Sequence, residues 1–190
     1  MPGFSIKNIF RRIDTNNDKQ LSDKEIYNMG KAAGLKKGFI VDERAEVKDA
    51  FLDKFDTNKD SKVSWDEFQK NSMKLIPADA YGADGKIDAD KVTKGVNGAI
   101  NDVDVNGDGK MSHKELYNST KAKLAEAGES FTGTKAEIAT KVAKHLLDAN
   151  GDGAISRDEA LKPAQDAVKL VNEANGHGAT AAAEDTTPNS

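Results

Sequence analysis

Four segments of the chain place oxygen-bearing side chains at one common spacing within twelve residues. The segments are DTNNDKQLSDKE (14–25), DTNKDSKVSWDE (56–67), DVNGDGKMSHKE (104–115) and DANGDGAISRDE (148–159). In each one, positions 1, 3 and 5 carry Asp, Asn and Asp, position 9 carries Ser, and position 12 carries Glu. This order predicts a loop that wraps a hard divalent cation, to which position 7 adds a backbone carbonyl.

Calcium is the ion that this donor set favours. It takes about 6 to 8 oxygens at about 2.3–2.6 Å in a tolerant geometry, whereas magnesium needs a strict octahedron and keeps several waters. A bidentate Glu at position 12 therefore favours calcium over magnesium, and the four loops would bind up to four Ca²⁺. The candidate metal ligands are Asp14, Asn16, Asp18, Gln20, Ser22, Glu25, Asp56, Asn58, Asp60, Lys62, Ser64, Glu67, Asp104, Asn106, Asp108, Lys110, Ser112, Glu115, Asp148, Asn150, Asp152, Ala154, Ser156 and Glu159.

Ordinary surface turns are the alternative interpretation, because Asp, Asn and Gly are also the commonest turn residues. One isolated match would leave that alternative open, but four matches in register favour metal loops. Position 8 adds to this, since each loop has one apolar residue there: Leu21, Val63, Met111 and Ile155. We expect these residues to form a short antiparallel bridge between paired loops.

The segments that flank the loops have the apolar periodicity of helices, so the fold class is predicted to be all-α. Before the first loop, Ile6, Ile9, Phe10 and Ile13 follow the i, i+3, i+4, i+7 spacing of a helical stripe. Pro163 is expected in the first turn of the last helix, where a missing amide is tolerated. We interpret the aromatic residues of these stripes as core.

On these loops and flanks, the chain is identified as a member of the EF-hand superfamily, with a resemblance that covers residues from about 5 to 172. The resemblance implies helix-loop-helix units that work in pairs, so four units should make two pairs with short β-bridges between paired loops. Loop starts at 14, 56, 104 and 148 lie 42, 48 and 44 residues apart. These intervals exceed those of calmodulin-like chains and make the chain more similar to sarcoplasmic calcium-binding proteins and calerythrin-like proteins.

One position departs from the family pattern. Position 6 normally carries Gly because the backbone turns there with positive φ. The last two loops carry glycine at positions 4 and 6, as the turn geometry requires: Gly107, Gly109, Gly151 and Gly153. Lys19 and Ser61 occupy position 6 in the first two loops. A side chain held in the left-handed region costs about 1 kcal/mol. We therefore predict that the third and fourth sites fill first.

The predicted domain organisation follows from this pairing. Residues 1–77 form an N-terminal pair, 78–87 a linker, 88–175 a C-terminal pair, and 176–190 a disordered tail. The linker offers an alternative, a vestigial loop starting at Ala80 in which Asp84, Gly85 and Asp88 match the pattern. Ala80 and Lys91 cannot ligate at positions 1 and 12, so we favour a linker and turn, with Asp88 capping the next helix.

Composition limits the other possibilities. The chain has 190 residues, 37% hydrophobic and 32% charged, with a net charge of −4 and no cysteine. Disulfides and thiolate chemistry are thereby excluded, and the absence of disulfides is compatible with a cytoplasmic protein. No apolar run approaches the roughly 20 residues of a membrane span, and no signal-peptide core or myristoylation glycine is found near the start. We expect a cytoplasmic monomer without a nucleic-acid partner.

The function predicted from the sequence is calcium-ion binding without catalysis. His113, His145 and His177 lack partners at metal or triad spacing, and His113, at loop position 10, is expected to face solvent. One Trp and three Tyr are few for the cofactor cavity of a photoprotein. An intracellular calcium buffer is favoured over a calcium sensor that binds a target protein, because sensor grooves are commonly rich in Met and this chain has few. An extracellular or other structural role is a third alternative.

Overall fold

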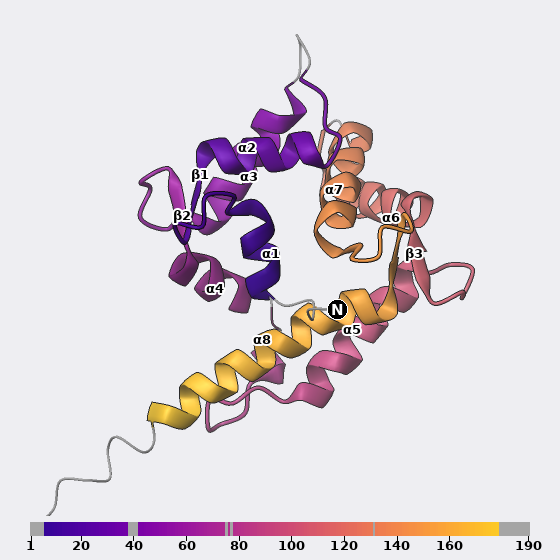
Figure 1. The fold of residues 1–190 in the computed structure, drawn as a ribbon. Helices are drawn as coiled ribbons and strands as arrows, with labels where there is room; N and C mark the ends of the chain where they lie inside the picture. The colour runs from indigo at the N-terminus through magenta and orange to yellow at the C-terminus, as the bar shows by residue number, and fades with distance from the viewer. Residues whose placement is uncertain (1–5, 38–41, 75, 77, 131, 179–190) are drawn as a thin grey trace, which may run out of the picture.

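Eight helices and four very short strands make up the part of the chain that the structure describes. The computed structural model describes residues 6–37, 42–74, 76, 78–130 and 132–178. In chain order the elements are α1 (Ile6–Ile13), β1 (Gln20–Ser22), α2 (Asp23–Ala32), α3 (Glu43–Phe55), β2 (Lys62–Ser64), α4 (Trp65–Met73), the 3₁₀ turn η1 (Ala78–Ala80), α5 (Ala89–Val103), β3 (Lys110–Ser112), α6 (His113–Glu126), α7 (Thr132–Leu147), β4 (Ala154–Ser156) and α8 (Arg157–Gly178). The predicted all-α fold is confirmed (Figure 1).

The strands pair as two antiparallel bridges, one in the N-terminal half (α1–α4) and one in the C-terminal half (α5–α8). β1 pairs with β2 so that Leu21 faces Val63, and β3 pairs with β4 so that Met111 faces Ile155. Each of the four pairing residues at position 8 is buried. The apolar residue that interrupts each hydrophilic loop therefore ties the loops together in pairs, as predicted.

The helices that follow the loops begin directly after a Ser that caps their first turn. Ser22, Ser64 and Ser112 act as N-caps, and each forms a capping box with the Glu three residues later. In such a box, the Ser hydroxyl accepts from the Glu amide while the Glu carboxylate accepts from the Ser amide. Position 9 and position 12 of each loop thus set the start of the helix as well as belonging to the predicted ligand set.

The two halves share part of their hydrophobic core. The largest cluster of buried side chains belongs mostly to α1–α4, with Phe10, Ile26 and Phe68 among its members. Ile138 of α7 and Ala167 of α8 also belong to this cluster. In Figure 1 these two helices lie beside the N-terminal half, and α8 runs along α5. The apolar faces of the two halves therefore pack against each other.

The connection between the halves is held against α8. Ala80 and Ile87 are buried in a second cluster with Val168 and Val171. The side-chain amide of Asn172 donates to the Ile87 carbonyl at 3.0 Å and accepts from the Ile87 amide at 2.7 Å. Asp88 caps α5, as predicted: its side chain accepts hydrogen bonds from the amides of Asp90 and Lys91.

Two predictions near the C-terminus need correction. Pro163 lies inside α8 rather than in its first turn, because the helix already begins at Arg157. A proline there removes one intrahelical hydrogen bond. The predicted tail also started too early, since α8 continues to Gly178. The rest of the predicted tail, 179–190, lies outside the described residues.

None of the helices in the described ranges combines the length and the apolar character needed to cross a bilayer.

Candidate metal centres

The carboxylate at position 1 organises each loop from inside. In the first loop, Asp14 is 4% exposed and accepts hydrogen bonds from the amides of Asp18 (3.2 Å) and Lys19 (3.1 Å). The position 6 amide donates to the position 1 carboxylate in the other loops too, at 2.8 to 2.9 Å. The loops therefore curl around their first ligand in the same way.

Positions 3 and 5 hold the next part of the loop. Asn16 Oδ1 accepts from the amide of Asp18 at 2.9 Å, and Asp18 Oδ1 accepts from the amide of Gln20 at 2.9 Å. The same two bonds recur in the remaining loops at 2.8 to 3.0 Å. Short side chains at these positions thus fix the backbone in the turn that the ligand spacing requires.

The Glu at position 12 closes the loop. Glu25 Oε1 accepts from the amides of Thr15 and Asn16, and Glu25 Oε2 accepts from the amide and hydroxyl of Ser22. Corresponding contacts hold Glu67, Glu115 and Glu159. Each Glu therefore joins the start of its loop to the start of its exit helix.

These contacts keep the closing carboxylates ionised. For Glu25, Glu67 and Glu159, burial raises the pKa, but the hydrogen bonds from the position 9 Ser and from the amides of positions 2 and 3 outweigh burial and lower it. For Glu115, the Ser112 hydroxyl is the largest influence and lowers the pKa. Charged carboxylates are the form that a calcium site needs.

The backbone turns left-handed at positions 4 and 6 of every loop. Gly107, Gly109, Gly151 and Gly153 supply these turns in the C-terminal pair, with φ from 72° to 88°. In the N-terminal pair the same turns fall on non-glycine residues with φ from 58° to 64°: Asn17, Lys19, Lys59 and Ser61. The predicted departure at position 6 thus coincides with positive φ. At position 4, the turns at Gly107 and Gly151 were predicted, whereas those at Asn17 and Lys59 were not.

Paired loops also touch through contacts that the sequence pattern did not indicate. The Trp65 amide donates to the Lys19 carbonyl, and the Arg157 amide donates to the Gly109 carbonyl, each at 3.2 Å. The Lys110 ammonium forms a salt bridge of 2.8 Å with Asp152. This contact, the largest influence on Asp152, lowers the pKa of its carboxyl. A position 7 side chain of the third loop thus reaches a predicted ligand of the fourth.

His113 makes a partner contact that the sequence did not suggest. Its side chain is 42% exposed, and Nε2 lies 3.0 Å from Oε2 of Glu137 on α7. The expectation that this histidine faces solvent is therefore met only in part, because the ring also contacts Glu137.

The donor set fits a hard cation, since the predicted side-chain ligands offer only oxygen. Across the described ranges, however, no three or more His, Cys, Asp or Glu side chains come together as a ready-made metal cluster. The closing Glu oxygens instead contact amides of their own loops. Binding an ion would therefore require each Glu to exchange amide contacts for the metal. The coordination by each predicted ligand stays a prediction.

Comparisons with known proteins agree with this chemistry. Residues 4–73 match the family described as an EF-hand domain pair, and residues 98–118 and 145–159 match the EF-hand family. A protein of Arabidopsis thaliana, "Probable calcium-binding protein CML34", is 30% identical over 58% of this chain and 90% of its own length. "Probable calcium-binding protein CML28" of Oryza sativa subsp. japonica is 27% identical over 84% of this chain and 91% of its own length. The chain belongs to the EF-hand superfamily of calcium-binding proteins.

Proposed function

We propose that all four loops bind Ca²⁺ and that the protein is an intracellular calcium buffer. Calcium binding itself follows from membership of the superfamily. Support for four sites comes from the repeated hydrogen-bond pattern, in which every loop has an ionised Glu at position 12 and the same curled backbone. The ligands would be the residues at positions 1, 3, 5, 7, 9 and 12 of each loop.

The observation that carries the buffering proposal is the shared core of the two halves. A sensor must present an apolar groove when calcium binds. Here Ile138 and Ala167 of the C-terminal half pack into the main cluster of the N-terminal half. Among the described residues, the large apolar side chains that stand exposed are Tyr81, at 38%, and Val105, at 83%. A large part of the apolar helix faces is thus already covered inside the molecule.

A calcium sensor is the second candidate, and one feature favours it. A pocket of about 680 Å³ lies between the halves, lined mainly by apolar side chains that include Phe51, Phe68, Val96 and Leu147. Apolar side chains from a target protein would fit such a hollow. Exposure of this pocket on calcium binding would convert the shared core into a binding surface.

Calorimetric calcium titration tests the number of sites. The wild-type chain should bind four ions. Each of the four variants Glu25→Gln, Glu67→Gln, Glu115→Gln and Glu159→Gln should lose one, because an amide cannot offer a bidentate carboxylate. Glu126→Gln is the matched control, since Glu126 is exposed at the end of α6 and outside the loops, and it should bind four. Fewer than four ions on the wild-type chain would refute the stoichiometry.

Hydrophobic-dye fluorescence separates the buffer from the sensor. A buffer keeps its core covered, so the signal should change little between metal-free and calcium-loaded protein. A large rise on adding calcium would reject the buffering proposal in favour of the sensor.

A further inference from the structure

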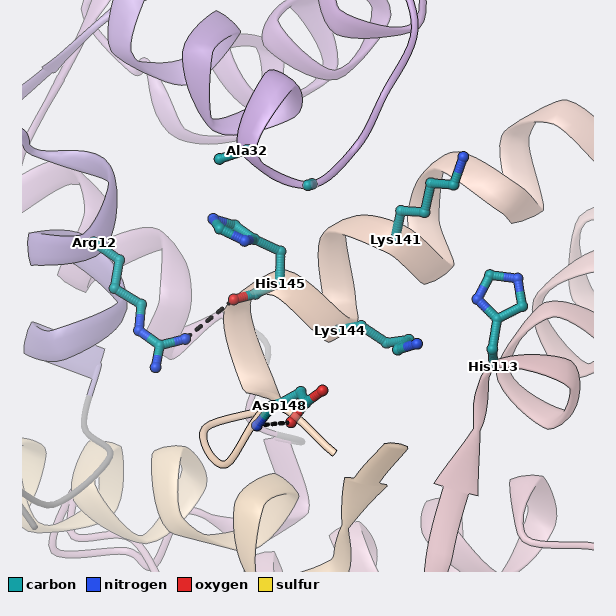
Figure 2. A pocket seen from close by; sticks show the side chains of 9 residues that line it. Arg12, Ala32, His113, Lys141, Lys144, His145 and Asp148 are labelled. Atoms are coloured by element: carbon teal, nitrogen blue, oxygen red, sulfur yellow. Dashed lines mark hydrogen bonds between the residues drawn. The ribbon is translucent and has the colours of Figure 1, made fainter. Parts of the chain in front are cut away.

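Basic side chains from both halves line a second pocket, distinct from the apolar one. The pocket has a volume of about 690 Å³ and lies among α1, the end of α2, the start of α6, α7 and the fourth loop. In Figure 2, Arg12 and the His145 ring lie to the left of α7, and Lys141, Lys144 and His113 lie to its right; all five line the pocket. The chain as a whole has a net charge of −4, so this gathering of cationic groups runs against its overall charge.

The acidic groups near this pocket are already engaged. Asp148 is the carboxylate among its lining residues, and its oxygens accept from the amides of Gly151 (2.7 Å) and Gly153 (2.9 Å). Glu137, which stands next to the pocket, contacts both Lys141 (3.2 Å) and His113 (3.0 Å). For Lys144, the described residues contain no carboxylate within ion-pair distance. Three cations, Arg12, Lys141 and Lys144, therefore face two carboxylates, Asp148 and Glu137, which leaves a net charge of +1 at the pocket.

Arg12 is held in place by the end of α7. Its Nη1 donates to the carbonyls of His145 at 3.1 Å and Leu146 at 3.4 Å. These carbonyls belong to the last turn of a helix, where they have no intrahelical partner. The contact joins the two halves and fixes the guanidinium beside the His145 ring. Burial lowers the pKa of His145, and the charge of Arg12 lowers it further.

Basic residues in the last turn of a helix also interact favourably with the helix dipole, and Lys144 and His145 are in that position on α7. The dipole does not account for Lys141, one turn earlier, or for His113, which comes from another element. The helix dipole alone therefore does not explain why groups from α1, α6 and α7 meet at one hollow.

We propose that this pocket binds a small phosphate-bearing anion. Arginine offers a planar fork of donors to oxyanions, and lysine offers a compact point charge. Phosphate carries more charge and more acceptor oxygens than a carboxylate, which suits three cations and two imidazoles placed around one space. The volume leaves room for a larger phosphorylated molecule than inorganic phosphate alone.

Titration of metal-free protein with pyrophosphate tests the proposal with no calcium bound to the fourth loop, whose Asp148 and Gly151 line the pocket. Metal is removed on a chelating resin, because soluble chelators are themselves polyanions. The readouts are binding heat and the NMR signal of the His145 ring, with sodium chloride at matched ionic strength as the reference. We expect a saturable shift of the His145 signal with pyrophosphate and none with chloride.

Two lysine variants show whether binding belongs to this pocket. Lys144→Gln should weaken pyrophosphate binding about tenfold, the effect of losing one charged hydrogen bond. Lys169→Gln removes the same charge from an exposed position on α8 and should leave binding unchanged. Thermal unfolding of both variants verifies that they are folded. Equal affinity of the two variants, or a shift that does not saturate, would overturn the proposal.

The phosphate group could belong to a free metabolite or to a lipid headgroup. Co-sedimentation with phosphatidylcholine vesicles, with and without phosphatidic acid, distinguishes these sources. Binding to phosphatidic acid that Lys144→Gln weakens and Lys169→Gln does not would assign the pocket to a headgroup. Pyrophosphate binding without vesicle binding would assign it to a soluble molecule.

Discussion

Left-handed backbone at position 6 gives the N-terminal loops a conformational cost that the C-terminal loops avoid. Lys19 and Ser61 have φ of 64° and 63°, whereas Gly109 and Gly153 have φ of 80° and 88°. The position 6 amide donates to the first carboxylate of the loop in all four cases. Neither Lys19 nor Ser61 can leave the left-handed region without losing that bond, so the cost is built into the folded loop.

Replacing both residues by glycine should stabilise the metal-free protein. Each substitution relieves about 1–2 kcal/mol of left-handed strain and loses about 0.5–1 kcal/mol through the greater freedom of glycine in the unfolded chain. The double variant Lys19→Gly/Ser61→Gly should therefore gain about 1–2 kcal/mol. For a chain of this size, each kcal/mol moves Tm by about 2–4 °C, so far-UV circular dichroism should show a rise of roughly 2–8 °C.

The reciprocal variant isolates the backbone as the cause. A Cβ at Gly109 would meet no heavy atom within 4 Å, so Gly109→Ala introduces no clash. It should nevertheless lower stability by about 1 kcal/mol, because alanine disfavours positive φ. An unchanged Tm in both experiments would refute the reasoning. Calorimetry in which the N-terminal pair saturates at lower free calcium than the C-terminal pair would contradict the predicted order of filling.

Three further predictions concern individual contacts around the loops. Trp65 lies edge-on to Phe10, with ring centroids 5.3 Å apart. The fluorescence of Trp65 should change as the second loop binds calcium, and a flat response at saturating calcium would mean that this loop binds no ion. Lys110→Gln should raise the calcium affinity of the fourth site in calorimetry, because the ammonium that now contacts Asp152 competes with the ion; an unchanged affinity would show that the salt bridge is irrelevant. The pKa of each closing Glu is lower in the folded protein than in the unfolded chain, where it is about 4.3. These carboxylates therefore stabilise the metal-free fold at pH above the unfolded pKa. Their contribution is lost as the pH falls through the folded pKa. Urea midpoints should therefore decrease below about pH 5, and midpoints that stay constant would contradict this.

Local features of this chain could be predicted because their causes lie within a few residues. The twelve-residue spacing predicted the loops, and the apolar residue at position 8 predicted both β-bridges. Ser at position 9 and Glu at position 12 form capping boxes, so the starts of α2, α4 and α6 follow from the same residues. The end of α8 was misjudged, because the small and polar residues after Val171 lack a clear apolar stripe.

Contacts between distant segments could not be predicted in the same way. No pattern near Arg12 indicates that its guanidinium meets carbonyls at the end of α7, and none near Lys110 indicates Asp152. Nor does periodicity along α7 reveal that Ile138 packs into the N-terminal core. Hydrogen bonds and apolar periodicity within a loop or helix are properties of the local chain, so the sequence alone determined the EF-hands and their pairing. The mutual covering of the two halves and the basic pocket between them depend on which helix faces fit together, and only the tertiary structure decided that.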